Sequence, residues 1–300
     1  MRVTCFSFLI LASISSMGQD GNLKKLGSWL TDHKFSIRKT FDGSSKDEGK
    51  PASIMLKEDY KSTNDYLSID LGAKISEWEL LKNESGSLIL YPKIEWHKSN
   101  DSTDKKDKLD AGINFEYYPF RLQAPNLPNG LPNKGLKLSP WFQGTSSYKR
   151  NFIDDVNELK ASFQISLSSN YKFLPGTSMR DKNSNLRFRY YPYVGVEYNK
   201  IPDLIEKGKT EEFSTSVARV FIEIWIFPQR LQLNLDGLYR VNLKENSILR
   251  KEMPMVSPSL NFYPGKQEAF SLGIEYKQGY DSESKFKFVQ IASFKLNAKL

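Results

Sequence analysis

The stretch FKFVQIASFKLNAKL (286–300) alternates apolar and polar residues up to the last residue of the chain. Phe286, Phe288, Phe294 and Leu296 share one parity, and Lys287 and Lys295 share the other. A period of two is that of a β-strand with one apolar face. Chain ends are usually polar and frayed unless something holds them. We therefore expect this stretch to be a closing strand, paired with 269–280 and with 51–58, with its apolar residues facing lipid and its lysines facing an interior.

The same alternation recurs along most of the chain after residue 50. It is clear in ELKASFQISLSSNY (158–171), RLQLNLDGLYRVNL (230–243) and FSLGIEYKQGY (270–280). We predict strands at 51–58, 66–76, 87–97, 109–120, 138–149, 157–172, 186–199, 215–227, 230–243, 255–263, 269–280 and 285–300.

Such strands occur in soluble β-sandwiches and in membrane β-barrels, and the two folds differ in strand length. Strands of a soluble sandwich usually have roughly 3–10 residues, and several predicted here are longer. In lipid, a sheet must close because a free edge finds no hydrogen bonds, and an even strand number suits such a barrel. No apolar run reaches the ~18–20 residues of a transmembrane helix. The sequence thus predicts an all-β fold: an antiparallel transmembrane β-barrel of about twelve strands over 51–300.

The beginning of the chain, MRVTCFSFLILASISSMGQD (1–20), has the pattern of a signal peptide. A basic residue, an apolar core and small residues follow one another, so we expect 1–18 to be removed by cleavage after about Gly18. Residues 19–50 would be a periplasmic lead-in, in which KFSIRKTF (34–41) is either a further strand or part of the lead-in. Cys5 is the only cysteine, so the mature chain would carry no thiol and no disulfide.

Four predicted strands end in aromatic–proline sequences: YYPF (117–120), KFLPG (172–176), IFPQ (226–229) and FYPG (262–265). Aromatic rings favour the membrane–water interface, and proline suits a strand end because it lacks an N–H donor. With the C-terminus in the periplasm, all four would lie at the periplasmic side, and 98–108, 200–214 and 244–254 would be extracellular loops.

Two features do not fit this arrangement well. The connection 121–137 is long for a periplasmic turn. Pro92, Pro192 and Pro258 fall inside predicted strands, so each requires a bulge or a shifted strand start.

On these features the chain resembles the Gram-negative outer-membrane β-barrel proteins, over about 50–300 and the signal peptide. The last strand is similar to their assembly signal, although Leu300 stands where an aromatic residue is usual. The aromatic–proline turns and the many lysines are similar to small barrels of the Bacteroidetes type. The resemblance implies an outer-membrane location and, as partners, outer-membrane lipid and the barrel assembly machinery.

The polar parity carries charged residues that we expect to face the lumen. They are Glu116, Arg187, Arg189, Glu197, Arg219, Glu223, Asp236, Arg240, Glu275 and Lys277. They could line an aqueous path and favour anions, as charged rings do in pores. They could equally pair with one another and fill the lumen, since eight-stranded barrels are filled and barrels of 16–18 strands are open.

The sequence offers few groups for chemistry. The net charge of +8 is spread over the apparent loops, whereas a nucleic-acid site needs basic residues on one face, so we expect no nucleic-acid partner. The acidic residues of SNDSTDKKDKLD (99–110) are interleaved with lysines and lack the glycine of a calcium loop. We expect no metal and no cofactor.

One stretch resembles a catalytic motif. EWHKSND (95–101) contains His97-x-Ser99-Asn100, which resembles the His-x-Ser-Asn pattern of outer-membrane phospholipase A. That resemblance implies a catalytic pair on the lipid-facing side. The parity of this strand instead points His97 and Ser99 inward or into a loop, so they are only weak catalytic candidates and we expect no enzyme.

Three functions follow, in order of preference. The first is a small passive channel or transport barrel for hydrophilic solutes. The second is a structural or partner-binding barrel with a filled lumen. The third is a phospholipase-type enzyme that uses His97 and Ser99.

Overall fold

The computed structural model describes most of the predicted strands. The described residues are 36–38, 52–59, 65–74, 78–82, 86–99, 106–120, 138–153, 155–169, 171, 174–176, 179–180, 186–202, 209–227, 230–244, 249–264 and 270–298. The expected signal peptide, most of the lead-in, the 121–137 connection and Leu300 lie outside them.

Within the described residues the chain forms strands and a single short 3-10 turn. The elements are β1 (Ser36–Arg38), β2 (Ala52–Asp59), β3 (Asp65–Lys74), β4 (Trp78–Lys82), β5 (Ser87–Ser99), β6 (Lys106–Tyr118), β7 (Leu138–Asn151), β8 (Val156–Ser169), β9 (Met179–Arg180), β10 (Leu186–Pro202), β11 (Thr210–Ile226), β12 (Leu231–Asn242), β13 (Glu252–Phe262), β14 (Phe270–Asp281), η2 (Ser282–Ser284) and β15 (Lys287–Ala298).

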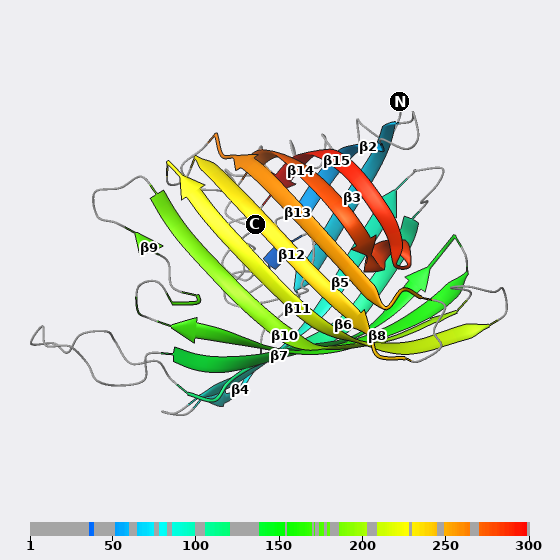
Figure 1. The fold of residues 1–300 in the computed structure, drawn as a ribbon, viewed down its shortest axis with the longest axis horizontal. Helices are drawn as coiled ribbons and strands as arrows, with labels where there is room; N and C mark the ends of the chain where they lie inside the picture. The colour runs from blue at the N-terminus through cyan, green and yellow to red at the C-terminus, as the bar shows by residue number, and fades with distance from the viewer. Residues whose placement is uncertain are drawn as a thin grey trace, which may run out of the picture.

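All described strands belong to one antiparallel sheet, and long neighbours pair in chain order (Figure 1). β15 pairs with β14 on one side and with β2 on the other, which confirms its prediction as the closing strand. β3 pairs with both β2 and β5, so the pairings return to their start. Twelve long strands of the described chain form this ring, and they correspond to the twelve predicted segments. The antiparallel all-β fold is therefore confirmed.

The three short strands extend the ring locally. β1 continues the pairing of β3 at Gly72–Lys74, and β9 pairs with the start of β10. β4 pairs with β5 at Ser87–Leu90, beside the stretch of β5 that β3 pairs. β3 and β4 thus follow one edge of β5 in succession.

We expected a bulge or a shifted strand start at Pro92, Pro192 and Pro258, and the ladders through these residues show no register shift. Pro92 pairs with β6, and on its other side the β5 ladder is interrupted between Leu90 and Lys93. Pro192 lies just before the start of pairing with β8 at Tyr193. Pro258 lies in the gap between Val256 and Ser259 in the ladder with β14. Each proline therefore sits where its strand is unpaired on one side, which accommodates the missing N–H.

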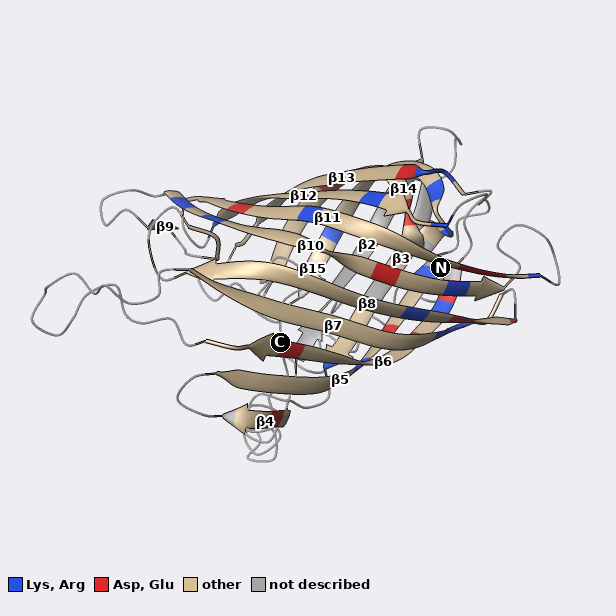
Figure 2. Cartoon of the chain, turned by 60° about the horizontal axis from the view of Figure 1, so that its bottom comes forward, with Lys and Arg blue, Asp and Glu red and all other residues tan. Residues whose placement is uncertain are grey.

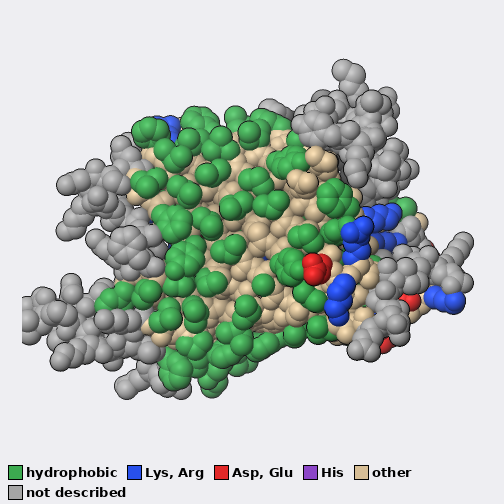
Figure 3. Space-filling model, in the orientation of Figure 1, with side chains coloured by type: hydrophobic (Ala, Val, Ile, Leu, Met, Phe, Trp, Pro, Cys, Tyr) green, Lys and Arg blue, Asp and Glu red, His purple; other side chains and the backbone are tan. Residues whose placement is uncertain are grey.

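Side-chain burial follows the two faces of each strand. On β15, Phe288 and Phe294 are exposed while Ser293 and Lys295 are buried. At the start of this stretch the prediction is wrong: Phe286 is buried and Lys287 is exposed, because the turn before β15 interrupts the alternation. Gln290 interrupts the apolar face but donates a hydrogen bond to the Tyr276 hydroxyl at 2.8 Å. Figure 3 shows apolar side chains spread over the described part of the face that it presents. The sheet thus has an apolar outside and a mainly polar inside.

The interior also contains two apolar clusters. One consists of Trp141, Tyr191, Tyr193 and Phe221, with Tyr118 packed against it. The other, which we call the mouth cluster, consists of Ile201, Phe213, Met253 and Phe286. The two clusters lie at different positions along the barrel axis. The residues of the mouth cluster lie near the end of β10 and the starts of β11, β13 and β15.

The barrel has two different ends. At the terminal end β15 finishes and β2 begins, and the aromatic–proline sequences after β6, β11 and β13 lie there. At the opposite end there are outward-facing ion pairs: Lys98–Asp107 and Lys200–Glu212 join neighbouring strands, and Arg150–Asp155 lies between the end of β7 and the turn before β8. In Figure 3 charged side chains gather at the right-hand edge and are scarce over the apolar area. This gives the outer surface an apolar belt with a charged border. Among the described residues, no helix is long and apolar enough to cross a membrane.

Candidate functional site

The inward side chains of the barrel are the candidate site. Glu116, Glu197, Arg219, Glu223 and Arg240 are buried, with Glu116 and Glu223 at 0% exposure. Arg187, Arg189, Asp236, Glu275 and Lys277 are half-buried. Figure 2 shows basic and acidic positions interleaved along the strands. Buried charges need partners, because desolvating an isolated charge is costly.

Arg189 and Glu223 stand directly opposite each other on β10 and β11. Arg189 Nε donates to Glu223 Oε2 at 2.7 Å. Gln232 Nε2 on β12 donates to the other oxygen of Glu223 at 2.9 Å, and the Tyr263 hydroxyl donates to Gln232 Oε1 at 2.9 Å. The carboxylate is thus held from two strands.

Two further arginines reach partners on other strands. Arg219 on β11 donates to both oxygens of Asp236 on β12, at 2.6 and 2.5 Å. Such a two-point contact is the strongest form of this pair. Arg240 on β12 reaches across β11 to Glu197 on β10, at 2.8 Å from Nε to Oε2. The pair therefore ties together three strands.

The arginines also lie over aromatic rings. Arg187 is 4.9 Å from the centroid of the Trp225 ring, Arg219 is 5.5 Å from that of Tyr193, and Arg240 is 5.8 Å from that of Phe286. Cations are attracted to ring faces within about 6 Å. Arginine heads are therefore packed against rings as well as paired with acids.

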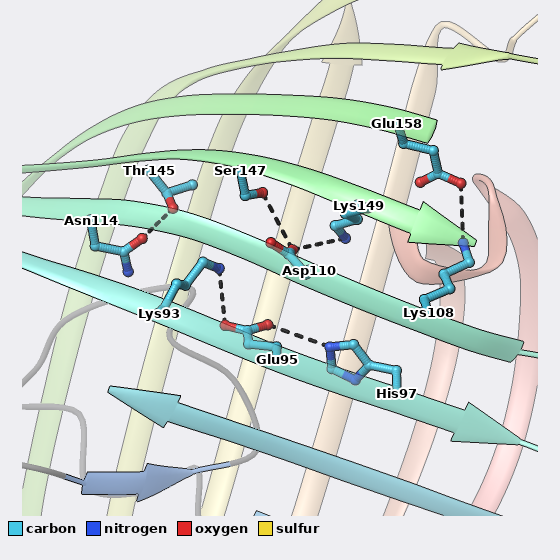
Figure 4. Close-up of polar contacts among 10 residues, drawn as sticks. All are labelled: Lys93, Glu95, His97, Lys108, Asp110, Asn114, Thr145, Ser147, Lys149 and Glu158. Carbon is cyan, nitrogen blue, oxygen red and sulfur yellow. Dashed lines mark hydrogen bonds and ion pairs between the residues drawn. The ribbon is translucent and has the colours of Figure 1, made fainter. Parts of the chain in front are cut away.

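A second polar network covers β5 to β8 (Figure 4). Lys93 Nζ lies 2.9 Å from Glu95, whose other oxygen lies 3.4 Å from His97 Nε2. Asp110 accepts from Ser147 at 3.3 Å and lies 3.6 Å from Lys149 Nζ.

The same network continues across β7. Lys108 on β6 reaches Glu158 on β8 at 3.3 Å. Apart from His97, these residues were not among our site candidates. Their parity is the signal that could have found them, since they share the inward face with the residues that were named.

The remaining candidates are also paired. Glu116 accepts hydrogen bonds from the hydroxyls of Tyr118, at 2.8 Å, and Tyr91, at 3.3 Å. Glu275 pairs with Lys295, and Lys277 lies 2.8 Å from Asp281. The structure therefore joins the candidates into several local pairs and not into one centre.

Burial shows how much of the interior is occupied. A wide aqueous pore would leave its lining in contact with water, yet Glu223, Gln232 and Lys93 are 0–2% exposed. Other side chains fill the interior at these heights. The inward residues of β12 to β14 have more contact with solvent: Asp236, Ser257, Ser259, Glu275 and Lys277 are half-buried. Solvent contact inside the barrel is thus uneven, and Arg187 and Arg189 on β10 are half-buried as well.

His97, one of the two phospholipase candidates, does not reach the outer face. His97 is 7% exposed and contacts Glu95 inside the barrel. Ser99 is the last residue of β5, and its side chain and Asn100 lie outside the described residues. In the part of the chain that the structure describes, no group of three or more His, Cys, Asp or Glu residues could hold a metal ion.

The Lys200–Glu212 pair lies at the charged border, outside the apolar belt. A hydrogen bond from Lys200, together with its charge, lowers the pKa of the Glu212 carboxyl, and Glu212 raises the pKa of Lys200 in return. Both side chains therefore stay charged at neutral pH, where a hydrocarbon environment would be unfavourable.

Comparisons with known proteins give only distant structural likeness. No family model matches the chain, and no curated protein matches it. A NanC porin is similar at 7% identity and a TM-score of 0.46, over 83% of this chain and 100% of that one. The transport unit of the autotransporter AIDA-I from Escherichia coli is similar at 9% identity and a TM-score of 0.44, over 87% and 94%. The outer-membrane channel DcaP of Acinetobacter baumannii is similar at 7% identity and a TM-score of 0.37, over 83% and 96%.

Proposed function

We propose that this chain is an integral β-barrel of the Gram-negative outer membrane that gives small hydrophilic solutes a narrow passive route. The observation that carries the membrane assignment is the reversal of the usual globular pattern. Val194 and Ile274 are each 58% exposed on the outside, while Glu116 and Glu223 are fully buried inside. Lipid favours an apolar exterior and a closed ladder of hydrogen bonds.

The route is proposed along the inner face of β12 to β14. Asp236, Ser259, Glu275 and Lys277 keep partial solvent contact there, and serine side chains leave more room than the arginines of β10 and β11. Acids and bases alternate along this wall, so we expect weak ion selectivity. The rest of the interior is packed, so we expect a small conductance.

Planar-bilayer recording of the purified chain tests this proposal. We expect discrete current steps much smaller than those of an open 16-stranded porin, because the interior is mostly occupied. Protection of the barrel from protease shows that the protein has inserted. Inserted protein that gives no current steps would contradict the channel.

A barrel with a filled lumen that serves as a structural or partner-binding element is the second candidate. The pairs Arg189–Glu223 and Arg240–Glu197 favour it, since they occupy part of the interior with side chains from β10, β11 and β12. Silent but fully inserted protein in the bilayer experiment supports this candidate.

Phospholipid hydrolysis is not expected. His97 is directed to the interior, whereas lipid contacts the outer surface. We expect the purified chain with calcium to release no fatty acid from detergent-dispersed phospholipid, and His97→Ala to behave identically. Release by the native chain that His97→Ala abolishes would restore the enzyme hypothesis.

A further inference from the structure

The opposite end of the interior combines polar groups that lack partners with an apolar cover. Asn199 on β10, Thr215 on β11 and Asn242 on β12 are 4%, 0% and 1% exposed. Asn199 Nδ2, Thr215 Oγ1 and Asn242 Nδ2 have no hydrogen-bond partner among the described residues. Buried polar groups are nearly always hydrogen-bonded, and an unmet one destabilises the fold. Three unmet groups in one place therefore require an explanation.

The strand registers bring the three side chains together. Thr215 on β11 lies opposite Asn242 on β12 and, on its other side, opposite Glu197 on β10. Asn199 is two residues from Glu197 on β10, so it lies on the same face and diagonally from Thr215. Directly opposed residues have Cβ atoms about 4.5–5.5 Å apart. The two amide N–H₂ groups and the hydroxyl thus form one patch, which we call the amide–hydroxyl patch.

The charged residues beside the patch have partners of their own, and Lys160 on β8, which lies opposite Asn199, is among them. Arg240 and Glu197 lie beside the patch and pair with each other at 2.8 Å. A patch whose own donor groups are neutral, beside charged residues that are already paired, suits an uncharged ligand better than an ion. The donors would serve hydroxyl oxygens of such a ligand.

The mouth cluster covers the patch on the side of the opposite end. Phe213 is the neighbour of Thr215 on the inner face, and its ring meets that of Phe286 edge to face at 5.1 Å. Met253 lies opposite Arg240 on β13. Phe286 and Met253 are 5% and 0% exposed, so apolar side chains separate the patch from solvent.

The backbone that delivers Phe286 is strained. Lys285 and Phe286 have φ angles of 53° and 58°, in the left-handed region that non-glycine residues avoid. The Phe286 N–H donates to the Asp281 carbonyl at 2.8 Å, which closes the turn. Strain of this kind persists where the surroundings enforce it, and it is common in elements that switch between two positions.

We propose that the amide–hydroxyl patch is a binding subsite for a small uncharged solute rich in hydroxyl groups, and that Phe286 is the movable cover of this subsite. When Phe286 swings away, the patch donates to the solute's hydroxyl oxygens and the Phe213 ring packs against its C–H face. This deepens the proposed channel, on which it rests, by assigning a solute class and a gate at the opposite end.

A single reporter cysteine tests the cover without any measurement of current. In a Cys5→Ser background, Val217→Cys places the only thiol of the chain beside the patch, at a position that is 4% exposed. We expect slow reaction with methyl methanethiosulfonate in vesicles, and a reaction at least roughly tenfold faster after Phe286→Ala, because the loss of buried ring contacts favours the open position. Equal rates with and without Phe286 would overturn the cover.

A matched control separates opening of the mouth from general loosening. Trp141→Ala also removes a large buried ring, but in the other apolar cluster. We expect it to leave the rate at Val217→Cys nearly unchanged. Equal acceleration by Trp141→Ala and Phe286→Ala would likewise contradict a specific role for Phe286.

Glucose as a probe tests the solute class. In the Phe286→Ala protein we expect glucose to slow labelling of Val217→Cys in a saturable way, and Asn199→Leu with Asn242→Leu to abolish the protection. Absence of protection, or protection that survives both leucine changes, would overturn the subsite. If glucose protects Val217→Cys from labelling in a protein that passes no current in bilayers, the subsite is supported and the channel is refuted.

Discussion

Val194→Arg should destabilise the barrel by about 2–4 kcal/mol in a lipid bilayer, the cost of a basic side chain at the middle of the hydrocarbon layer. Val194 is 58% exposed and lies at the middle of β10, far from the charged border that Lys200 and Glu212 mark. The arginine would have to stay in hydrocarbon or distort the lipid around it.

The measurement is the free energy of unfolding from liposomes by urea titration, followed by tryptophan fluorescence. Val194→Leu is the matched control, since it keeps the surface apolar. On a water-exposed surface, substitutions usually change stability by less than about 0.5 kcal/mol. An arginine variant that is as stable as the leucine variant would therefore place this face in water and end the membrane assignment.

Glu223→Leu should cost about 3–5 kcal/mol, because it leaves Arg189 in the interior without its carboxylate. Glu223 is 0% exposed, receives Arg189 at 2.7 Å and also binds Gln232. The double variant Arg189→Leu with Glu223→Leu should lose less than the single one, since no unpaired charge remains.

The same unfolding titration measures these variants, and the four proteins of the double-mutant cycle isolate the pair. Glu212→Leu is the control for an exposed pair, for which we expect a loss of no more than about 1 kcal/mol. If Glu223→Leu costs no more than Glu212→Leu, the interior behaves as water. An open pore would then replace the packed lumen.

Most of the barrel wall could be predicted from the sequence. The alternation of Phe288, Phe294 and Lys295 was enough to predict which side of β15 is apolar and that β14 and β2 are its neighbours. The prolines were harder. The sequence places Pro192 and Pro258 within strands. It does not show that each lies where its strand is unpaired on one side, because this depends on where the pairing of the neighbouring strands begins and ends.

For the polar interior, the sequence predicted which residues face inward but not which of them contact one another. That Glu197 and Arg240 share the inward parity follows from counting residues, but their contact across β11 depends on two strand registers. The inward aromatics Trp141, Tyr193 and Phe221 break the simple rule that polar side chains face inward. Nothing in the local pattern distinguishes them from residues on the lipid side.

By itself, the sequence determined that this protein is built from long two-faced strands, because a period of two is a local property of the extended backbone. Only the tertiary structure decided which charges pair, that rings and ion pairs share the interior, and that the Phe286 ring packs against Phe213 beside the amide–hydroxyl patch. These features depend on barrel circumference and on contacts between residues far apart in the chain, and no local alternation encodes either.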